Sequence, residues 1–538
     1  MKILMMTNTY VPIVGGLEKS IQVFSEEFRA RGHEVKIVAP EFKQRPAYEP
    51  DVIRVPAIEK FVGTDFSVGL PLPEMLQDAV EKFKPDIVHS HHPFLMGDLA
   101  LRVCGQNKIP LVFTYHTMFE HYTDHFAMDN PIMQKFVVKL ATGYANLADQ
   151  VIAPSGSVAE VLRARKVKTP IEVVPTGIDL RRFAPAPAAA ARRKYKIPKN
   201  AFVLGYTGRL TPEKNLIFLA QAAAAFMKQE KRAHFLIIGS GPSEREMRKI
   251  FRMHHLQKRA HYAGVLKGRA LVKAYHAMDV FAFASKSETQ GIVVAEAMAA
   301  GLPVVALDAP GVREVVRDKE NGRLLSFESR PRFASALAWC FARRPAEWEA
   351  VKKQALETAA LFSSGVCAEK ALKVYEKILG RPGSRSEEEW GQSQWKALLG
   401  RFGTELHMLL NLGRAAGSAI VKAAIAEPSP KDKLTELYQK KAREALESWM
   451  TALKKVRRQI PDAPPEMKAK LEAAAEIMAR RIHECETELT ELGSHVLGAC
   501  EALDKFIESQ HAEAKTELEK IEAEPDTAAA GVSKEALE

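Results

Sequence analysis

The sequence predicts an α/β protein: two doubly wound, Rossmann-like domains that face a cleft, followed by an all-α C-terminal domain. Three observations lead to this prediction. Short apolar runs alternate with helical patterns over about the first 380 of the 538 residues, an Ala- and Pro-rich stretch divides this alternation into two similar halves, and helix-forming residues dominate beyond residue 385. Short apolar runs between helical segments are typical of a parallel sheet with helices on both faces.

The first domain is expected to span residues 1–183 and to begin with a strand, a loop and a helix. Ile3–Met6 form a short apolar run, Gly15 and Gly16 punctuate the loop after it, and apolar residues then recur at helical spacing. Further strands are predicted at four apolar runs: 35–38, 86–89, 111–113 and 151–153.

The second domain is expected to span residues 184–361, beginning with the Ala- and Pro-rich stretch 184–193 as a linker. Its strands are predicted at four apolar runs: 202–206, 234–238, 280–283 and 303–306. Ligands of doubly wound sheets bind at the carboxyl ends of the strands. Two such domains that face each other therefore predict a binding cleft between them.

The C-terminal extension, residues 386–538, has a different character. It is rich in Ala, Leu, Glu and Lys, its apolar residues recur at three- and four-residue steps, and the Pro-rich turn 461–465 separates two long patterns. This spacing predicts a helical hairpin or bundle with a frayed, acidic end. We favour a bundle that packs on itself, pairs two subunits or recruits a partner protein; membrane docking and free helices are the alternatives.

The net charge of +11 is concentrated in residues 151–300, which hold 26 Lys and Arg against ten Asp and Glu. Such a stretch suits an anionic membrane surface, a phosphorylated ligand or nucleic acid, and a solvated face is the simpler alternative. Nucleic acid is disfavoured because few aromatic residues lie among the basic ones.

Several features favour the cytoplasm. The sequence contains no run of 18 apolar residues, so no membrane-spanning helix is predicted. The apolar run at the N-terminus is too short for a signal peptide. The five cysteines are scattered and form neither a disulfide framework nor a CxxC metal site.

The most specific motif contains two glutamates, Glu288 and Glu296, with Gly291 between them where a loop turns into a helix. The backbone N–H groups of Gly291, Ile292 and Val293 would lie in the first turn, where they and the helix dipole favour a diphosphate. Glu288 is placed to accept hydrogen bonds from a sugar, and Glu296 from a ribose diol. A surface helix with two solvated glutamates is the alternative.

A second motif, residues 208–215, follows the predicted strand that ends at Tyr206. Arg209 and Lys214 lie five residues apart across a tight turn, so both can converge on one anion, such as a departing diphosphate whose charge grows as a glycosidic bond breaks. The alternative is a solvated basic loop. His89 and His91 suggest a metal, but no Cys or carboxylate with ligand spacing completes a site, and we expect none.

These motifs resemble the retaining glycosyltransferases of the GT-B architecture, in the group with a Glu-x7-Glu element. The resemblance covers about residues 1–380 and rests on Glu288 to Glu296, the loop from Gly208 to Lys214, the Gly15–Gly16 turn and residues 174–179. It implies a nucleotide-diphosphate sugar donor, a UDP-sugar here, transfer with retention, and no metal or other cofactor. Residues 362–385 are expected to form a crossover helix and linker back to the first domain.

The resemblance also implies site residues. His116 takes the position of a histidine over the donor sugar, where it helps to fix the reacting geometry. Besides His116, catalytic roles are assigned to Arg209, Lys214 and Glu288. Donor binding is assigned to the following residues: Gly15, Gly16, Arg209, Lys214, Gly291, Ile292, Val293 and Glu296. No residue is assigned as a nucleophile, since front-face attack with the leaving phosphate as base is the usual proposal for the group.

The sequence around His89–Gly97 and Thr114–Thr123 is most similar to the diacylglycerol glucosyltransferase branch, and the apolar stretch 61–73 suits a lipid entrance. The expected function is therefore transfer of a hexose, glucose first, from a UDP-sugar to a lipid acceptor, by an enzyme peripheral to the inner face of the cell membrane. One alternative is a glycosyltransferase whose acceptor is a soluble molecule or a precursor of a polysaccharide or lipopolysaccharide. The other is an assembly or scaffold protein whose sugar-nucleotide site is secondary or silent.

Overall fold

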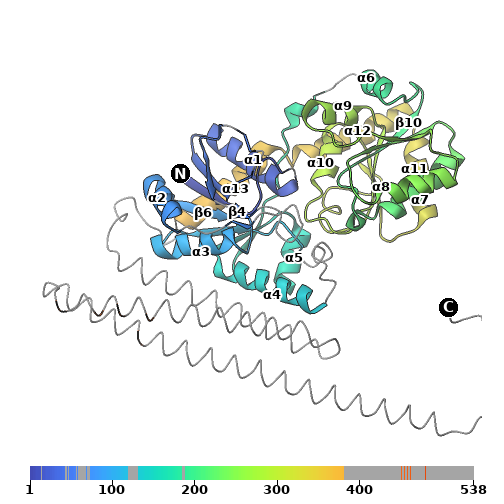
Figure 1. The fold of residues 1–538 in the computed structure, drawn as a ribbon. Coiled ribbons are helices and arrows are strands. Elements are labelled where there is room, and N and C mark those ends of the chain that lie inside the picture. Colours follow the sequence, from blue (N-terminus) through green and yellow to red (C-terminus); the bar gives the residue numbers. More distant parts are fainter. Residues whose placement is uncertain are drawn as a thin grey trace, which may run out of the picture. The chain divides into compact units, whose positions relative to one another are not determined.

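The computed structural model describes residues 1–380 except 14, 43–44, 47, 56, 59–67, 70–72, 119–130 and 185–187, and five isolated positions between 450 and 479. Two parallel sheets with flanking helices make up this part of the chain and confirm the two predicted Rossmann-like domains (Figure 1). The helical prediction for residues 386–538 and most of the apolar stretch 61–73 lie outside the described residues.

The first sheet has seven strands in the order β3-β2-β1-β6-β7-β8-β9, and all neighbours are parallel. Its strands are β1 (Lys2–Met6), β2 (Glu34–Pro40), β3 (Val52–Val55), β6 (Ile87–Ser90), β7 (Leu111–Thr114), β8 (Gln150–Ala153) and β9 (Ile171–Val173). A separate antiparallel pair consists of β4 (Ala57–Ile58) and β5 (Val68–Gly69). The helices of this domain are α1 (Gly16–Ala30), α2 (Pro73–Phe83), α3 (Met96–Asn107), α4 (Pro131–Leu147) and α5 (Gly156–Ala164).

The second sheet has six parallel strands in the order β12-β11-β10-β13-β14-β15. Its strands are β10 (Phe202–Thr207), β11 (Ala233–Ile238), β12 (Ala260–Tyr262), β13 (Val280–Phe283), β14 (Val304–Leu307) and β15 (Gly322–Leu325). The helices are α6 (Ala188–Lys194), α7 (Leu216–Gln229), α8 (Glu244–Met253), α9 (Gly268–His276), α10 (Ile292–Ala299), α11 (Arg330–Phe341) and α12 (Pro345–Ala360), with 3-10 turns η4 (Leu180–Phe183) and η5 (Pro212–Lys214).

The central strands are buried because both of their faces are covered, and most of their residues are apolar. Every residue of β6, β7, β11 and β13 is buried, as expected for strands sandwiched between two helical layers. The edge strands β9 and β12 are only half-buried or exposed. The sequence pattern did not predict these edge strands.

Helix α13 (Ser364–Leu379) belongs to the first domain although it follows the second domain in sequence. It packs against α1, beside which it lies in Figure 1. Cys367 and Tyr375 are buried in the same apolar cluster as Phe28, and a parallel bridge joins Ile178 to Ser363. The end of the described chain thus completes the core of the first domain.

The strand orders define where ligands are expected. In each sheet the order reverses at one point, between β1 and β6 in the first and between β10 and β13 in the second. Such switch points leave a crevice at the carboxyl ends of the strands. The loops that carry Gly15, Arg209 and Glu288 begin there.

Candidate functional site

The loop after β13 ends in a sharp turn at Gly291, which starts helix α10. Gly291 has a φ of +69°, in the left-handed region that favours glycine. Ile292 and Val293 follow in the first turn, where backbone N–H groups have no acceptor inside the helix. The structure therefore places these N–H groups at the carboxyl edge of the sheet, in a position suited to an anion.

Lys214 and Glu288 meet at this edge. The Nζ atom of Lys214 lies 2.7 Å from Oε1 of Glu288, and the two side chains are 14% and 15% exposed. Burial raises the pKa of Glu288, but the charge and hydrogen bond of Lys214 outweigh it, so the pKa lies below its ordinary value. Glu288 is therefore a carboxylate at neutral pH, able to accept hydrogen bonds.

Arg209 lies on the same loop as Lys214 and is more accessible. Its Nη2 atom is 3.2 Å from Oε1 of Glu213, which is 9% exposed, whereas the arginine side chain is 51% exposed. The hydroxyl of Thr211 donates to the same Glu213 oxygen at 2.6 Å. Glu213 thus orients Arg209 while leaving much of the guanidinium open to a ligand.

Glu296, the predicted ribose acceptor, already has partners on both carboxylate oxygens. Oε1 forms an ion pair with Lys19 of α1, and Oε2 accepts a hydrogen bond from the buried Tyr275 hydroxyl at 2.9 Å. Burial and the nearby Arg182 lower the pKa of Lys19 to about 8. A ribose that bound at Oε1 of Glu296 would share this oxygen with Lys19 or displace it.

Gln290 forms a second link between the two domains, which the sequence motifs did not reveal. Its amide oxygen accepts from the backbone N–H of Thr176 at 2.7 Å, and its amide nitrogen donates to the Thr176 carbonyl at 2.8 Å. The Thr176 hydroxyl in turn donates to Ser20 of α1 at 2.9 Å. Gln290 directly precedes Gly291, so this pair of hydrogen bonds fixes the turn into α10.

Gly15 and Gly16 lie at the start of α1, as predicted. Gly15 is the residue before the first helical turn. A Cβ atom built on Gly16 would lie 3.6 Å from Cδ1 of Ile292. The first domain's glycine turn and the first residue of α10 are therefore neighbours.

His116 follows β7 and is half-buried. Its Nε2 atom lies 2.9 Å from Nδ1 of His91, so one ring donates to the other. Burial lowers the pKa of both imidazoles well below the ordinary value, which makes both neutral at pH 7. The structure thus gives His116 a hydrogen-bonding partner within the first domain.

His89 has both ring nitrogens occupied. Nε2 is 2.6 Å from the Thr114 hydroxyl, and Nδ1 is 2.6 Å from the Tyr375 hydroxyl of α13. Within residues 1–380, gaps aside, no three His, Cys, Asp or Glu side chains are grouped so as to hold a metal ion. These histidines act as neutral hydrogen-bonding groups in the core of the first domain.

Sequence reasoning thus singled out the two loops that the structure brings to one edge of the sheet, but it did not single out Lys19, Tyr275 or Gln290. Only Gln290 had a signal, since it adjoins the Gly291 turn. Lys19 lies one turn after the Gly15–Gly16 pair and resembles any exposed helical lysine in the sequence.

Two family domains match nearly all of the described chain. Residues 14–182 match the domain described as Glycosyltransferase Family 4, and residues 188–356 match the domain described as Glycosyl transferases group 1. These matches meet at the junction of the two observed sheets.

Two named relatives are similar to this chain over most of their own length. The chain is 30% identical over 330 residues to an alpha-monoglucosyldiacylglycerol synthase of Streptococcus pneumoniae, covering 60% of this chain and 75% of the relative. It is 28% identical over 387 residues to a GDP-mannose-dependent alpha-mannosyltransferase of Mycobacterium tuberculosis, covering 71% and 97%.

Solved structures share the fold. A sucrose-phosphate synthase from Thermosynechococcus elongatus superposes with a TM-score of 0.59 at 23% identity, covering 70% of this chain and 99% of that one. The HepE protein of Anabaena, solved with UDP, gives a TM-score of 0.57 at 20% identity, covering 70% and 100%. Both therefore have the two-domain GT-B fold in common with this chain.

Proposed function

This chain belongs to the glycosyltransferases that pair a family 4 domain with a group 1 domain, and from this premise we propose that it transfers glucose from UDP-glucose to a membrane lipid such as diacylglycerol, with retention of the anomeric configuration. The similarity to a monoglucosyldiacylglycerol synthase supports a glycolipid hexosyltransferase. In this proposal residues 1–183 carry the acceptor and residues 184–361 the donor.

The observation that carries the proposal is the convergence of Arg209, Lys214 and Glu288 beside the first turn of α10. The diphosphate of the donor would lie on the N–H groups of Ile292 and Val293. As the bond to the sugar breaks, negative charge grows on the leaving diphosphate, and prepositioned cations stabilise it most at that moment. Arg209 is open to such a ligand, and Lys214 is held in place by Glu288.

The sugar would be held from both sides. The Glu288 carboxylate, which accepts from Lys214 at Oε1, would also accept hydrogen bonds from sugar hydroxyls. His116 is neutral, so it can donate to or accept from a hydroxyl without a charge change. Together these contacts hold the anomeric carbon close to the acceptor hydroxyl. The leaving phosphate oxygen takes the acceptor proton.

The nucleotide would be bound at Glu296. A ribose diol donates to this carboxylate once Lys19 releases it, and Tyr275 keeps its own hydrogen bond to the other oxygen. No metal or cofactor enters this scheme, because Arg209 and Lys214 supply the positive charge.

The acceptor would reach the enzyme at the membrane surface. Among the described residues, no helix is long and apolar enough to cross a bilayer. We therefore propose peripheral attachment at the inner face of the cell membrane. The excess of basic residues in 151–300 supports attraction to anionic lipids, at about 1 kcal/mol for each residue near the surface.

The test is transfer by the purified full chain. UDP-glucose and GDP-mannose, each radiolabelled in the sugar, are offered with vesicles that contain or lack diacylglycerol, and the lipid extract is separated by chromatography. We expect label in a glycolipid from UDP-glucose and diacylglycerol, with an α-linkage by NMR. Transfer only from GDP-mannose would overturn the proposal that UDP-glucose is the donor. A labelled product only in the aqueous phase would overturn the proposal that the acceptor is a lipid.

A matched pair of variants shows whether the assigned site performs the transfer. Glu288→Gln keeps the size of the side chain but removes the charge that holds Lys214. Glu320→Gln makes the same change at an exposed residue. Loss of transfer in the first variant alone supports the assignment, and equal transfer in both would refute it.

A further inference from the structure

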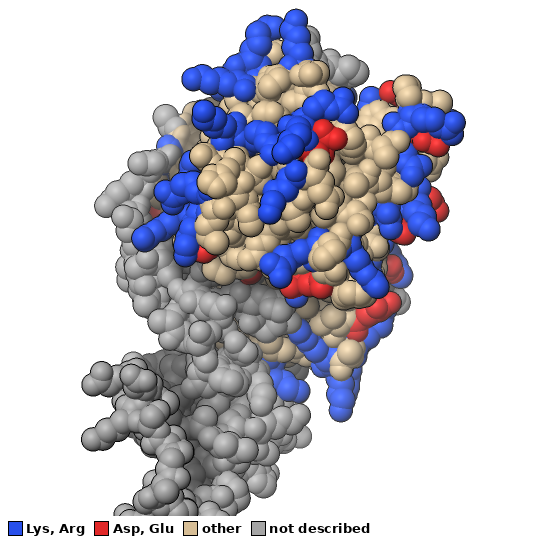
Figure 2. All heavy atoms as spheres, turned by 90° about the vertical axis from the view of Figure 1, so that its right-hand side faces the viewer, with Lys and Arg blue, Asp and Glu red and all other residues tan. Residues whose placement is uncertain are grey.

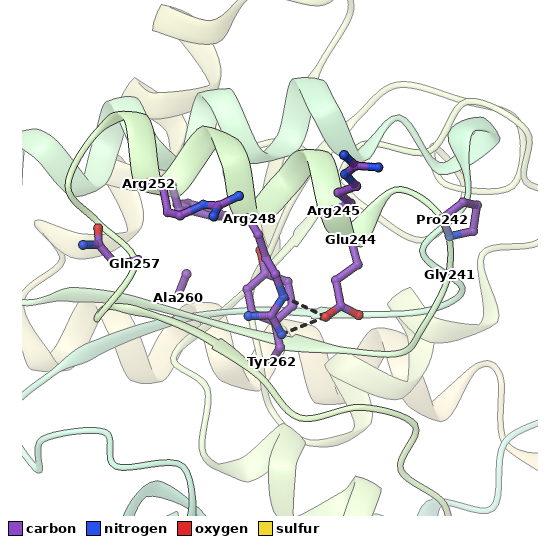
Figure 3. A pocket seen from close by; sticks show the side chains of 10 residues that line it. Gly241, Pro242, Glu244, Arg245, Arg248, Arg252, Gln257, Ala260 and Tyr262 are labelled. Atoms are coloured by element: carbon purple, nitrogen blue, oxygen red, sulfur yellow. Dashed lines mark hydrogen bonds and ion pairs between the residues drawn. The ribbon is translucent and has the colours of Figure 1, made fainter.

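A pocket of about 650 Å³ lies on the second domain, between helix α8 and the edge strand β12 (Figure 3). Three arginines of α8 line it: Arg245, Arg248 and Arg252. The aromatic rings of Phe251 and Tyr262 supply an apolar part of the lining.

The sequence of α8 explains the arginine wall. Residues three and four apart lie on the same face of a helix, so positions 245, 248 and 252 form one stripe. Met247 and Ile250 lie on another face and are buried in the core of the domain. The packing of α8 therefore turns the arginine stripe toward the pocket.

The charges in the pocket are incompletely balanced. Arg248 pairs with Glu244 at 2.7 Å, and its guanidinium lies 3.8 Å from the centre of the Tyr262 ring. Neither Arg245 nor Arg252 has an acidic partner among the described residues. The lining thus contains three guanidiniums and one carboxylate, which leaves it with two uncompensated positive charges.

The surroundings add to this positive potential. Figure 2 looks onto the second domain, where Lys and Arg side chains cover far more of the face than acidic side chains do. Two exposed basic residues near α8 are Lys249, on the helix itself, and Lys258, in the loop that leads to β12. An anion would therefore be attracted to this side of the domain before it made contact.

One end of the pocket, at Gly241 and Pro242, adjoins the loop that carries Arg209, since the backbone N–H of Ser243 donates to the Leu210 carbonyl at 2.8 Å. The arginine wall of the pocket lies on α8. Strand β12 lies three strands from β13 in the sheet, and neighbouring strands are about 4.8 Å apart. Lys214 follows β10 and Glu288 follows β13. The arginines lie on α8, which contacts the edge strand β12 through Arg248 and Tyr262. A diphosphate bound at α10 would leave these arginines unused.

We propose that this pocket binds a phosphate-bearing ligand at a second anion site of the enzyme. A guanidinium offers a planar pair of N–H donors that matches two phosphate oxygens, and such charge-assisted bonds are the strong ones. Arg245 and Arg252 would bind the phosphate, while Arg248 is held by Glu244 and Tyr262. The rings of Phe251 and Tyr262 suit the organic part of a phosphate ester or of a phospholipid headgroup.

The experiment uses the full chain and two kinds of probe. Inorganic phosphate and glycerol 3-phosphate are titrated by calorimetry, and vesicles of phosphatidylglycerol or of phosphatidylcholine are sedimented with the protein. The test variant is Arg245→Gln/Arg252→Gln. The matched control, Arg193→Gln/Arg269→Gln, removes two charges from exposed positions outside the pocket.

We expect the test variant to bind phosphate probes or phosphatidylglycerol vesicles about tenfold more weakly or worse, and the control to bind like the unmodified protein. Binding of the soluble esters assigns the site to a free phosphate; binding of anionic vesicles alone assigns it to a lipid headgroup. Equal losses in both variants, or no binding of any probe, would overturn the site.

UDP affinity is the readout that separates this pocket from the donor site. We expect both double variants to bind UDP as the unmodified protein does. A loss of UDP affinity confined to the test variant would show that the arginines belong to the donor site, and would overturn a second one. Because the substituted side chains are exposed, unchanged thermal unfolding is expected and checks that both variants are folded.

Discussion

The ammonium group of Lys19 forms an ion pair with the carboxylate of Glu296, whose second oxygen accepts a hydrogen bond from Tyr275 at 2.9 Å. Lys19 comes from the first domain and the other two residues from the second. The carboxylate that we assign to the ribose is therefore occupied by the protein itself before nucleotide binds. A nucleotide that uses Oε1 of Glu296 competes with Lys19 for this oxygen.

Removal of this competitor is expected to strengthen nucleotide binding. In Lys19→Met the Tyr275 hydrogen bond remains and one oxygen of Glu296 becomes available to the ribose. We expect UDP to bind about three- to tenfold more tightly, since one hydrogen bond is worth about 1 kcal/mol. Calorimetric titration with UDP measures this. The exposed Lys228→Met is the control, and weaker binding to Lys19→Met would mean that Lys19 contacts the nucleotide instead.

The same competition predicts a pH dependence. The pKa of Lys19 is lowered to about 8, so the side chain is an ammonium below that pH and a neutral amine above it. Only the ammonium pairs with the Glu296 carboxylate as an ion. UDP affinity of the unmodified protein should therefore rise between pH 7 and pH 9. Lys19→Met should lose this rise, and parallel curves for the two proteins would exclude Lys19 as the titrating group.

Arg209 is expected to act on turnover more than on binding. Its guanidinium is half-exposed and oriented by Glu213, and the charge that it meets grows only as the sugar leaves. Arg209→Ala should lower kcat about a hundredfold or more and change the dissociation constant of UDP by less than about fivefold. The exposed Arg193→Ala is the control. An unchanged kcat would remove Arg209 from the reaction.

The sequence predicted the central strands well and the edge strands poorly, for a physical reason. Strands such as β11 and β13 are covered on both faces, so every residue in them is buried and, apart from His234, their sequence is apolar. Strand β12, Ala-His-Tyr, is only half-buried. Because it lies at the edge of the sheet, its sequence carries no such run.

A similar distinction holds for the candidate site. Lys214 and Glu288 were assigned to one site from two separate motifs, and the structure places them 2.7 Å apart because their loops leave adjacent strands at the switch point of one sheet. Lys19 and Gln290 were missed. Their partners, Glu296 and Thr176, lie more than a hundred residues away in the other domain, and no local pattern specifies which residues meet across a domain boundary.

The buried histidines of the first domain predict sensitivity to acid. Burial lowers the pKa of His89 and of His92 to about 3 from an ordinary 6.5. Between these values the unfolded chain binds more protons than the folded chain, so the free energy of unfolding falls as pH decreases below 6.5. The expected loss is about 1.4 kcal/mol per pH unit for each histidine.

Urea unfolding at pH 7 and pH 5 tests this. In His92→Asn the side-chain oxygen can still accept from the Asn8 backbone N–H, which now donates to the imidazole at 3.1 Å. The difference in unfolding free energy between the two pH values should shrink by about 2 kcal/mol. The exposed His255→Asn should leave the difference unchanged. The same difference in both variants would rule out His92 as a source of acid sensitivity.

Gln290 should stabilise the junction of the two domains. It is buried, and its amide makes both hydrogen bonds that the Thr176 backbone offers. Gln290→Ala leaves the N–H and the carbonyl of Thr176 without these partners, so we expect a loss of about 2–3 kcal/mol in the free energy of unfolding.

Gln290→Glu is the more specific test, because its carboxylate still accepts from the N–H but meets the Thr176 carbonyl with a like partial charge. The Gln290→Glu variant should therefore be less stable than the unmodified protein at pH 7. At pH 5 part of this stability should return, because a protonated carboxyl can donate to the Thr176 carbonyl. Equal stability of the Glu variant at the two pH values, after the change of the unmodified protein is subtracted, would show that Thr176 is not held through this pair of hydrogen bonds.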